Sequence, residues 1–166
     1  FDFKDKIIYL MKIKLFVIGK TKNRHLLEGE KDYEKRLKHY CKFTEQILLE
    51  VKNASKLSKN ELLNKEGKLI LKKLNPNDDI ILLDENGESF SSVAFSQFLG
   101  KKMLSSTKTM VFIIGGAFGF SNEVYSRCNF KLSLSKMTFS HQMVRLIFKE
   151  QLYRAFTIHK REKYHH

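Results

Sequence analysis

Proline and cysteine are scarce in this sequence of 166 residues, with one proline, Pro76, and two cysteines, Cys41 and Cys128. The two cysteines lie far apart and form no CxxC pair, which argues against a disulfide framework and against a cysteine metal cage. Long apolar runs are also missing. The longest, MVFII at 110–114, falls well short of the roughly 20 residues that a membrane helix needs. Residues 1–10 are charged and lack the apolar centre of a secretory signal. We therefore expect two reduced thiols in a cytoplasmic protein that neither spans a membrane nor binds a metal.

Several sequence motifs that are typical of a particular chemistry are absent as well. There is no GxGxxG followed by an acidic residue after a strand, and no Walker loop with Gly-Lys-Ser/Thr. A nicotinamide cofactor or a nucleoside triphosphate is thus poorly supported. The nucleophile elbow GxSxG and the zinc motif HExxH are missing too, which argues against those two classes of hydrolase.

Positive charge is abundant: Lys and Arg total 31 against 18 Asp and Glu, for a formal net charge of +13. Such a balance favours a polyanionic partner, because each phosphate that a lysine or arginine neutralises releases condensed counterions. Nucleic acid is the expected partner. The alternative is that lysine serves here as a general surface solubiliser.

The chain alternates between β-rich runs and segments with helical spacing, without internal repeats. Met11 opens the first run, so we expect a single domain over 11–166 and treat residues 1–10 as an upstream extension without a role. The predicted strands are 12–19, 45–51, 79–84, 109–114 and 130–135, and the predicted helices are 24–41, a segment opened by a Ser58–Glu61 capping box and running to Leu74, 92–104, 122–127 and 141–157.

This alternation predicts an α/β fold, a parallel sheet flanked by helices on both faces. The uniformly apolar strands 79–84 and 109–114 are expected at its centre. Ligands of such sheets bind beyond the carboxyl ends of the strands. Three loops, 84–88, 115–121 and 135–141, should therefore lie together on one rim.

The stretch VFIIGGAFGFS, residues 111–121, runs from a strand directly into Gly115 and Gly116, with Gly119 three positions later. Glycine permits positive φ and lets the main chain approach a ligand closely. These glycines indicate either a tight turn or a stretch of exposed main chain against which a cofactor binds.

The segment around SHQMVR, residues 140–145, opens the last long helix, and Ser140 can cap it. His141 and Arg145 are four residues apart and share a helical face near the N-terminus. A cation is disfavoured at that end of the helix dipole, so Arg145 suggests an anion-binding site. The alternative is a solvated arginine paired with Glu150 or another carboxylate.

The end of the chain is basic and aromatic. Arg154 is a candidate for RNA contact and equally for a structural salt bridge. The tail holds Arg161, Lys163, Tyr164 and His165, a mixture that suits a phosphate contact and a base stack. Disorder is the alternative for such a tail.

Taken together, these residues resemble the RNA large-subunit methyltransferase H family of the SPOUT superfamily. Coverage runs from Met11 to the end of the chain. One departure is Ser140, where the family usually has a proline. The matching blocks are MKIKLFVIGK at the start, YEKRL (33–37), KEG (65–67), LLDENG (82–87), FIIGGAFG (112–119), LSLSKMTFSHQMVR (132–145), EQLYRAF (150–156) and YHH (164–166).

The resemblance implies a homodimeric SPOUT fold with a C-terminal trefoil knot, a rare exception to unthreaded topology. It implies S-adenosylmethionine as cofactor and methylation of N3 of a pseudouridine in 23S rRNA of assembled 70S ribosomes. The rival functions are methylation of tRNA by another SPOUT enzyme and a ribosome-associated binding factor without catalysis.

The resemblance also assigns roles to residues. Arg145 would stabilise charge on the base or grip a phosphate, and His141, Tyr164 or His165 would take or relay the N3 proton, the tail reaching into the pocket of a partner subunit. The candidates for RNA contact stay those that the basic end of the chain itself suggests, Arg154, Arg161 and Lys163. The cofactor pocket falls on Leu83, Gly115, Leu134, Ser135, Lys136, Met137, Thr138 and Phe139.

Overall fold

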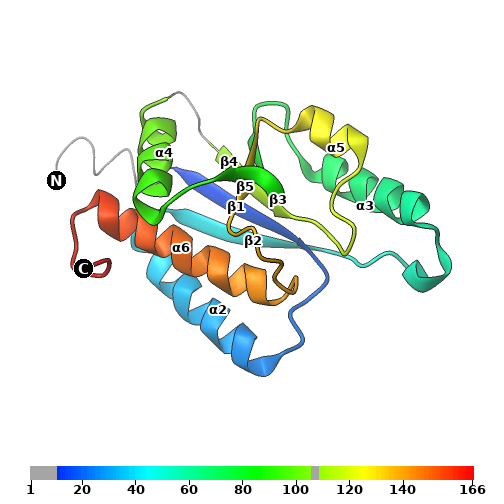
Figure 1. The fold of residues 1–166 in the computed structure, drawn as a ribbon, viewed down its shortest axis with the longest axis horizontal. Helices are drawn as coiled ribbons and strands as arrows, with labels where there is room; N and C mark the ends of the chain where they lie inside the picture. The colour runs from blue at the N-terminus through cyan, green and yellow to red at the C-terminus, as the bar shows by residue number, and fades with distance from the viewer. Residues whose placement is uncertain (1–10, 106–108) are drawn as a thin grey trace.

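The computed structural model describes residues 11–105 and 109–166 (Figure 1). These residues form a five-stranded sheet in the order β2-β1-β4-β3-β5, in which all neighbouring strands are parallel. The strands are β1 (Lys12–Ile18), β2 (Lys42–Leu48), β3 (Asp79–Ser89), β4 (Thr109–Ile114) and β5 (Phe130–Ser133). The helices are α2 (Arg24–Leu37), the short 3₁₀ helix η1 (Ala54–Lys56), α3 (Lys59–Lys73), α4 (Ser92–Leu104), α5 (Asn122–Arg127) and α6 (Met143–His159).

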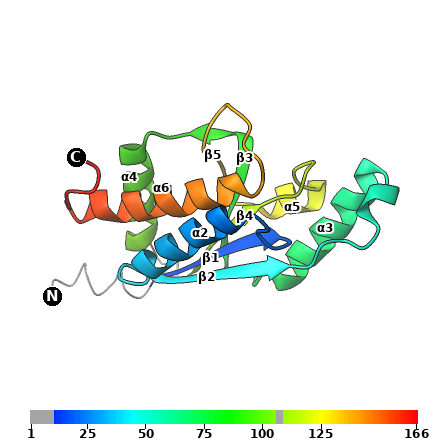
Figure 2. The same ribbon diagram turned by 90° about the horizontal axis from the view of Figure 1, so that it is seen from below.

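Helices cover both faces of the sheet because side chains alternate along its buried strands. In β4, Met110 and Phe112 join a core with α2, α4 and α6, whereas Val111 and Ile113 join a second core with α3 and α5. All four side chains are fully buried. Figure 2 shows α2 and α6 side by side over the sheet, where they contact each other. The predicted α/β fold with a parallel sheet is confirmed, and so is the central position of β3 and β4.

A buried charge cluster joins α2, β2 and α6. The Lys149 ammonium donates hydrogen bonds to Glu30 at 2.9 Å, to Glu34 at 2.6 Å and also to Glu45. Burial disfavours the ammonium, but the hydrogen bonds that it donates to Glu34 and Glu45 outweigh this effect and raise the pKa of Lys149 above its ordinary value. The consecutive elements α2 and β2 are thereby fixed to α6, which lies about 100 residues further along the chain.

Two predicted helix starts are confirmed. Ser58 and Glu61 form a reciprocal capping box at α3, in which the Ser58 hydroxyl accepts from the Glu61 amide and the Glu61 carboxylate accepts from the Ser58 amide. Ser121 caps α5 by accepting from the Val124 amide. At α6 the first helical residue is Met143 rather than residue 141. Ser140 still contributes, because its hydroxyl accepts from the Met143 amide at 3.2 Å.

The structure corrects two strands and one helix end. The second strand spans Lys42–Leu48 rather than 45–51, because it pairs with β1 over that range. Residues ENGES, expected to be a turn, continue β3 to Ser89, because Glu88 and Ser89 pair with β5 beyond an irregularity after Leu83. The first helix ends at Leu37 rather than 41, where the Tyr40 amide bonds to the Leu37 carbonyl in a tighter i→i+3 turn.

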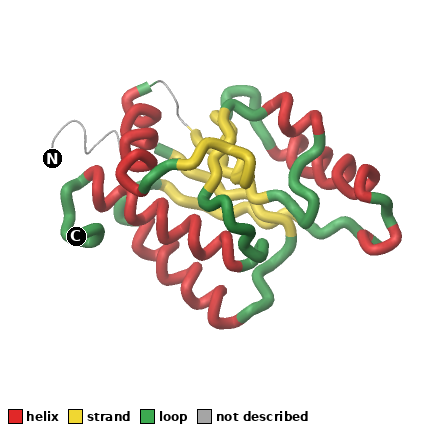
Figure 3. Tube along the Cα trace, in the orientation of Figure 1, coloured by secondary structure: helices red, strands yellow, loops and turns green. Residues whose placement is uncertain are grey.

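Loops gather at the carboxyl edge of the sheet, as Figure 3 shows for the green segments that lead from β4 and β5 to α5 and α6. The upstream extension expected at residues 1–10 lies outside the described residues. The trefoil knot stays a prediction. Within 11–105 and 109–166, no helix is both long enough and apolar enough to cross a membrane.

Candidate active site

A pocket of about 480 Å³ lies at the carboxyl edge of the sheet. Its wall overlaps the three segments predicted on one rim, 84–88, 115–121 and 135–141. It consists of residues 83–86, which are part of β3, residues 114–120 at and after the end of β4, and most of residues 134–141 before α6. Lys59, Tyr125 and Val144 complete it from α3, α5 and α6. This pocket is large enough for a nucleoside-sized ligand.

The glycine loop forms both a tight turn and one wall of the pocket. Gly116 and Gly119 pair across an isolated bridge, and Gly119 has a φ of +84°, which disfavours other residues. A Cβ on Gly115 would lie 2.7 Å from the Gly119 carbonyl oxygen, and one on Gly116 would lie 2.6 Å from a carboxylate oxygen of Glu66. The turn interpretation is therefore correct. Because the same glycines line the pocket, their main-chain atoms also face any ligand there.

Asp84 is held rigidly in the opposite part of the wall. The Tyr125 hydroxyl donates to its Oδ2 at 2.5 Å, and the Asn86 amide donates to its Oδ1 at 2.9 Å. Burial, and then the bond to Asp84, raises the pKa of Tyr125 well above its ordinary value, so the phenol stays a donor. Each Asp84 oxygen retains a second lone pair for a ligand. Sequence reasoning missed both residues, although Asp84 ends a wholly apolar run inside LLDENG.

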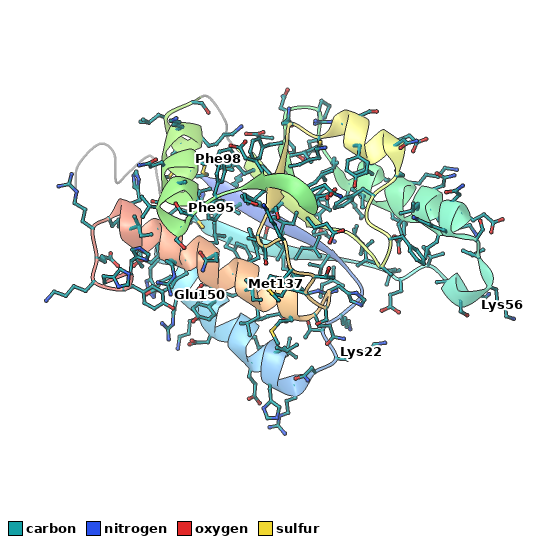
Figure 4. All side chains as sticks on the ribbon, in the orientation of Figure 1. Lys22, Lys56, Phe95, Phe98, Met137 and Glu150 are labelled. Atoms are coloured by element: carbon teal, nitrogen blue, oxygen red, sulfur yellow. The ribbon has the colours of Figure 1, made fainter. Side chains whose placement is uncertain are left out.

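The loop before α6 is shaped by its own serines and is tied to the β3 side. The Ser135 hydroxyl accepts from the Met137 amide at 2.9 Å, and Thr138 donates to Glu85 across the pocket at 3.3 Å. Met137, labelled in Figure 4, is 78% exposed although it lines the pocket. Of the predicted cofactor-binding residues, Lys136 alone lies off the wall, which includes Leu83, Gly115, Leu134, Ser135, Met137, Thr138 and Phe139.

Two of the predicted catalytic residues, His141 and Arg145, lie close together but in different environments. His141 lines the pocket. Arg145 is buried behind it, and its guanidinium donates to the carbonyl oxygens of Ile18 at 2.8 Å and Gly19 at 2.9 Å. It also donates to the His141 carbonyl at 3.0 Å. The sequence suggested an anion or a carboxylate as its partner; the structure gives neutral carbonyls instead. Burial lowers the pKa of Arg145.

The C-terminal tail folds back on its own chain, away from the pocket. The Tyr164 hydroxyl lies 3.1 Å from the Tyr33 hydroxyl and donates to Glu150 at 3.1 Å. Arg154 forms a salt bridge with Glu150 at 2.6 Å and lies 3.3 Å from His165 Nδ1. Val144 on the pocket wall and Arg154 are separated by about 15 Å of helix axis.

This tail cluster bears on several predictions. The salt-bridge alternative for Arg154 is present in the structure, and the tail packs against α6 and α2 instead of being unstructured. Arg161 and Lys163 are exposed. Tyr164 and His165 do not line the pocket of their own subunit, so their catalytic roles stay predictions.

Within the described part of the chain, no group of His, Cys, Asp and Glu could hold a metal ion.

Comparison with known proteins defines the class of this fold and site. A family model described as a predicted SPOUT methyltransferase matches residues 11–165. The chain therefore belongs to the SPOUT methyltransferase family, and the resemblance seen in the sequence is confirmed.

Two similar proteins are both named ribosomal RNA large subunit methyltransferase H. The one from Flavobacterium psychrophilum is 58% identical over 156 residues, covering 94% of this chain and 99% of that protein. The one from Parabacteroides distasonis is 51% identical with the same coverage. A probable methylase family protein from Haemophilus influenzae Rd KW20 matches 93% of this chain and 69% of its own, with a TM-score of 0.48 and 15% identity. That last likeness is too loose to support a conclusion.

Proposed function

We propose that this protein methylates N3 of a pseudouridine in 23S rRNA of assembled ribosomes, with S-adenosylmethionine as the methyl donor. The name shared by relatives at 51% to 58% identity supports the substrate class. The observation that carries the proposal is the pocket at the carboxyl edge of the sheet, whose wall combines a glycine turn with the loop before α6.

The pocket residues fit such a donor. Main chain at Gly115 and Gly116 offers a flat surface to the adenosine, and Leu83, Leu134 and Val144 line the same pocket with apolar side chains. Asp84, fixed by Tyr125, can accept hydrogen bonds from ribose hydroxyls or from the amino group of the methionine moiety. The loop 134–139 would enclose the bound molecule.

The donor supplies a methyl group on a positively charged sulfur, which is already a good electrophile. The chain therefore has to align the base and to accept the N3 proton. His141 on the pocket wall is the candidate acceptor in the same subunit. Arg145 fixes the carbonyl of His141 to the end of β1, and in this conformation it is a positioning residue. A direct contact with the substrate would require these bonds to open.

A homodimer is part of the proposal. Tyr164 and His165 lie outside the pocket of their own subunit, so they can act only on a partner's pocket. Apolar side chains near the pocket are exposed, with Phe118 at 51%, Met137 at 78% and Met143 at 40%. Patches of this kind mark sites of association. As the proposed substrate is the ribosome, we expect the protein in the cytoplasm.

Transfer of a labelled methyl group separates the candidate functions. The purified protein should label 70S ribosomes in preference to free 23S rRNA and tRNA, and calorimetry should detect S-adenosylmethionine binding. Labelling of tRNA alone would favour a different SPOUT enzyme. Absence of both heat and label would favour a binding factor without catalysis.

A further inference from the structure

Lysines without ionic partners cover one protruding part of the molecule, formed by η1 and α3. Every lysine between residues 52 and 73 is exposed, and none takes part in an ion pair between described residues. In Figure 4, Lys56 lies at the outer tip of this part. We call it the lysine surface; its members are Lys52, Lys56, Lys59, Lys65, Lys68, Lys72 and Lys73.

The acidic residues of the same segment do not balance this charge. Glu66 is buried, and the Glu61 carboxylate is engaged in the capping box with Ser58. Helix α2 differs in net charge, because its four acidic residues balance its four lysines and arginines, although Lys31 and Lys35 form no ion pair either. Arg24 pairs with Glu28 and Arg36 pairs with Asp32. The two segments therefore differ in local charge balance: positive charge is in excess on η1 and α3, whereas it is neutralised on α2.

The lysine surface faces away from the core. Leu62, Glu66 and Ile70 are the buried face of α3, and the helical period of 3.6 residues places Lys65, Lys68 and Lys72 in one row on the other side. Exposed large apolar side chains of the described residues all lie outside 52–73. A protein interface normally needs an apolar centre, so the surface is suited to a polyanion instead.

One end of this surface reaches the pocket. Lys59, the first residue of α3, lines the pocket together with Phe118, and its Nζ lies 5.8 Å from the centre of the Phe118 ring. Positive charge thus extends from the pocket along α3. A nucleic-acid strand whose base enters the pocket would have its neighbouring phosphates near this end.

We propose that η1 and α3 dock on the phosphate backbone of ribosomal RNA and orient it toward the pocket. This inference rests on the proposed function for the identity of the RNA. It adds a surface different from the tail residues Arg154, Arg161 and Lys163, of which Arg154 is already paired with Glu150. Phosphate contacts position a nucleic acid without reading its sequence, so the lysine surface contributes affinity and register.

The test compares two triple variants that remove the same charge from different helices. K65Q/K68Q/K72Q changes the lysine surface, and K31Q/K35Q/K38Q changes exposed lysines on and just after α2. Glutamine has a helix propensity close to that of lysine, so both variants should fold. Circular dichroism and calorimetry with S-adenosylmethionine establish that fold and donor site are unchanged before RNA binding is measured.

The measured quantity is the Kd for 70S ribosomes and for protein-free 23S rRNA over a range of salt concentrations. For the α3 variant we expect Kd to rise roughly tenfold or more on both, and the slope of log Kd against log salt to fall by about 2 to 3. The Michaelis constant for ribosomes should rise while kcat is retained. The α2 variant should stay within about threefold of wild type.

Two results would overturn the proposal. Equal effects of the two triple variants would mean that net charge matters and its location does not. Weakened binding to ribosomes with unchanged binding to protein-free rRNA would assign the surface to an acidic ribosomal protein. Because binding is the readout, a failure of the proposed methyl transfer would be seen separately, in the wild-type methylation assay.

Discussion

The Tyr125 hydroxyl donates a 2.5 Å hydrogen bond to Oδ2 of Asp84 and thereby joins α5 to the end of the buried part of β3. Both residues line the pocket. The bond orients a carboxylate on the wall of the pocket that we propose as the methyl-donor site.

Replacing Asp84 by Asn should weaken S-adenosylmethionine binding about tenfold or more, since a charge-assisted acceptor is lost. Tyr125→Phe should have a smaller effect, because the carboxylate stays but is less well oriented. Calorimetry measures both Kd values. Val93→Ala, at an exposed position outside the pocket, is the control. Unchanged affinity in Asp84→Asn would show that the carboxylate does not touch the donor.

Arg145→Ala should destabilise the fold by roughly 3 kcal/mol, because it leaves the buried carbonyl of Gly19 and the half-buried carbonyl of Ile18 without these donors. Urea unfolding followed by circular dichroism gives the difference. Arg145→Lys should recover only part of it, since one ammonium cannot reproduce a planar fork of donors. A purely catalytic arginine would instead leave the unfolding midpoint unchanged in both variants.

Lys149→Met should destabilise the protein by about 3 to 5 kcal/mol near neutral pH, because it leaves Glu30 buried without its cation. Since the pKa of Lys149 is raised in the folded state, its stabilising contribution is fully present below the unfolded pKa of about 10.5. It is lost as pH rises through the higher folded pKa. The gap in unfolding free energy between wild type and variant should therefore narrow above about pH 10.5. A gap that stays constant across this range would contradict the assignment.

Glu66→Gln should stabilise the protein at neutral pH. Burial raises the pKa of Glu66 in the folded state, so the cost of its charge is absent below the unfolded pKa of about 4.5, grows as pH rises from there to the folded pKa, and is fully present above it. Thermal unfolding at several pH values should show that the stability of the variant relative to wild type increases from pH 4 to pH 7. Glu61→Gln removes a charge at the exposed start of the same helix and should show no such gain. A variant that loses stability at pH 7 would mean that the carboxylate is needed in its charged form.

The centre of the fold could be predicted from local sequence. The apolar runs of β3 and β4 lack any alternation, and only central parallel strands are buried on both faces, so their place followed directly. The helix caps at Ser58 and Ser121 each involve two residues three positions apart, so they too could be predicted from the local sequence. The rim loops followed from the parallel topology, because the carboxyl ends of such strands share one edge.

Long-range partners could not be predicted. The continuation of β3 through ENGES depends on a register shift against β5, more than 40 residues further along the chain. Arg145 bonds to carbonyl oxygens 126 and 127 residues away, and main-chain acceptors carry no residue type that a sequence could reveal. Nothing in the local sequence marks Lys149, since Glu30, Glu34 and Glu45 converge on it only after α2, β2 and α6 pack together.

Mass spectrometry of 23S rRNA from cells with and without this gene tests the central claim most directly. We expect one pseudouridine to lose a single methyl group in the deletion strain. The wild-type gene should restore that methyl group, and an Asp84→Asn allele should restore it poorly. An identical modification pattern in both strains would contradict the proposed function.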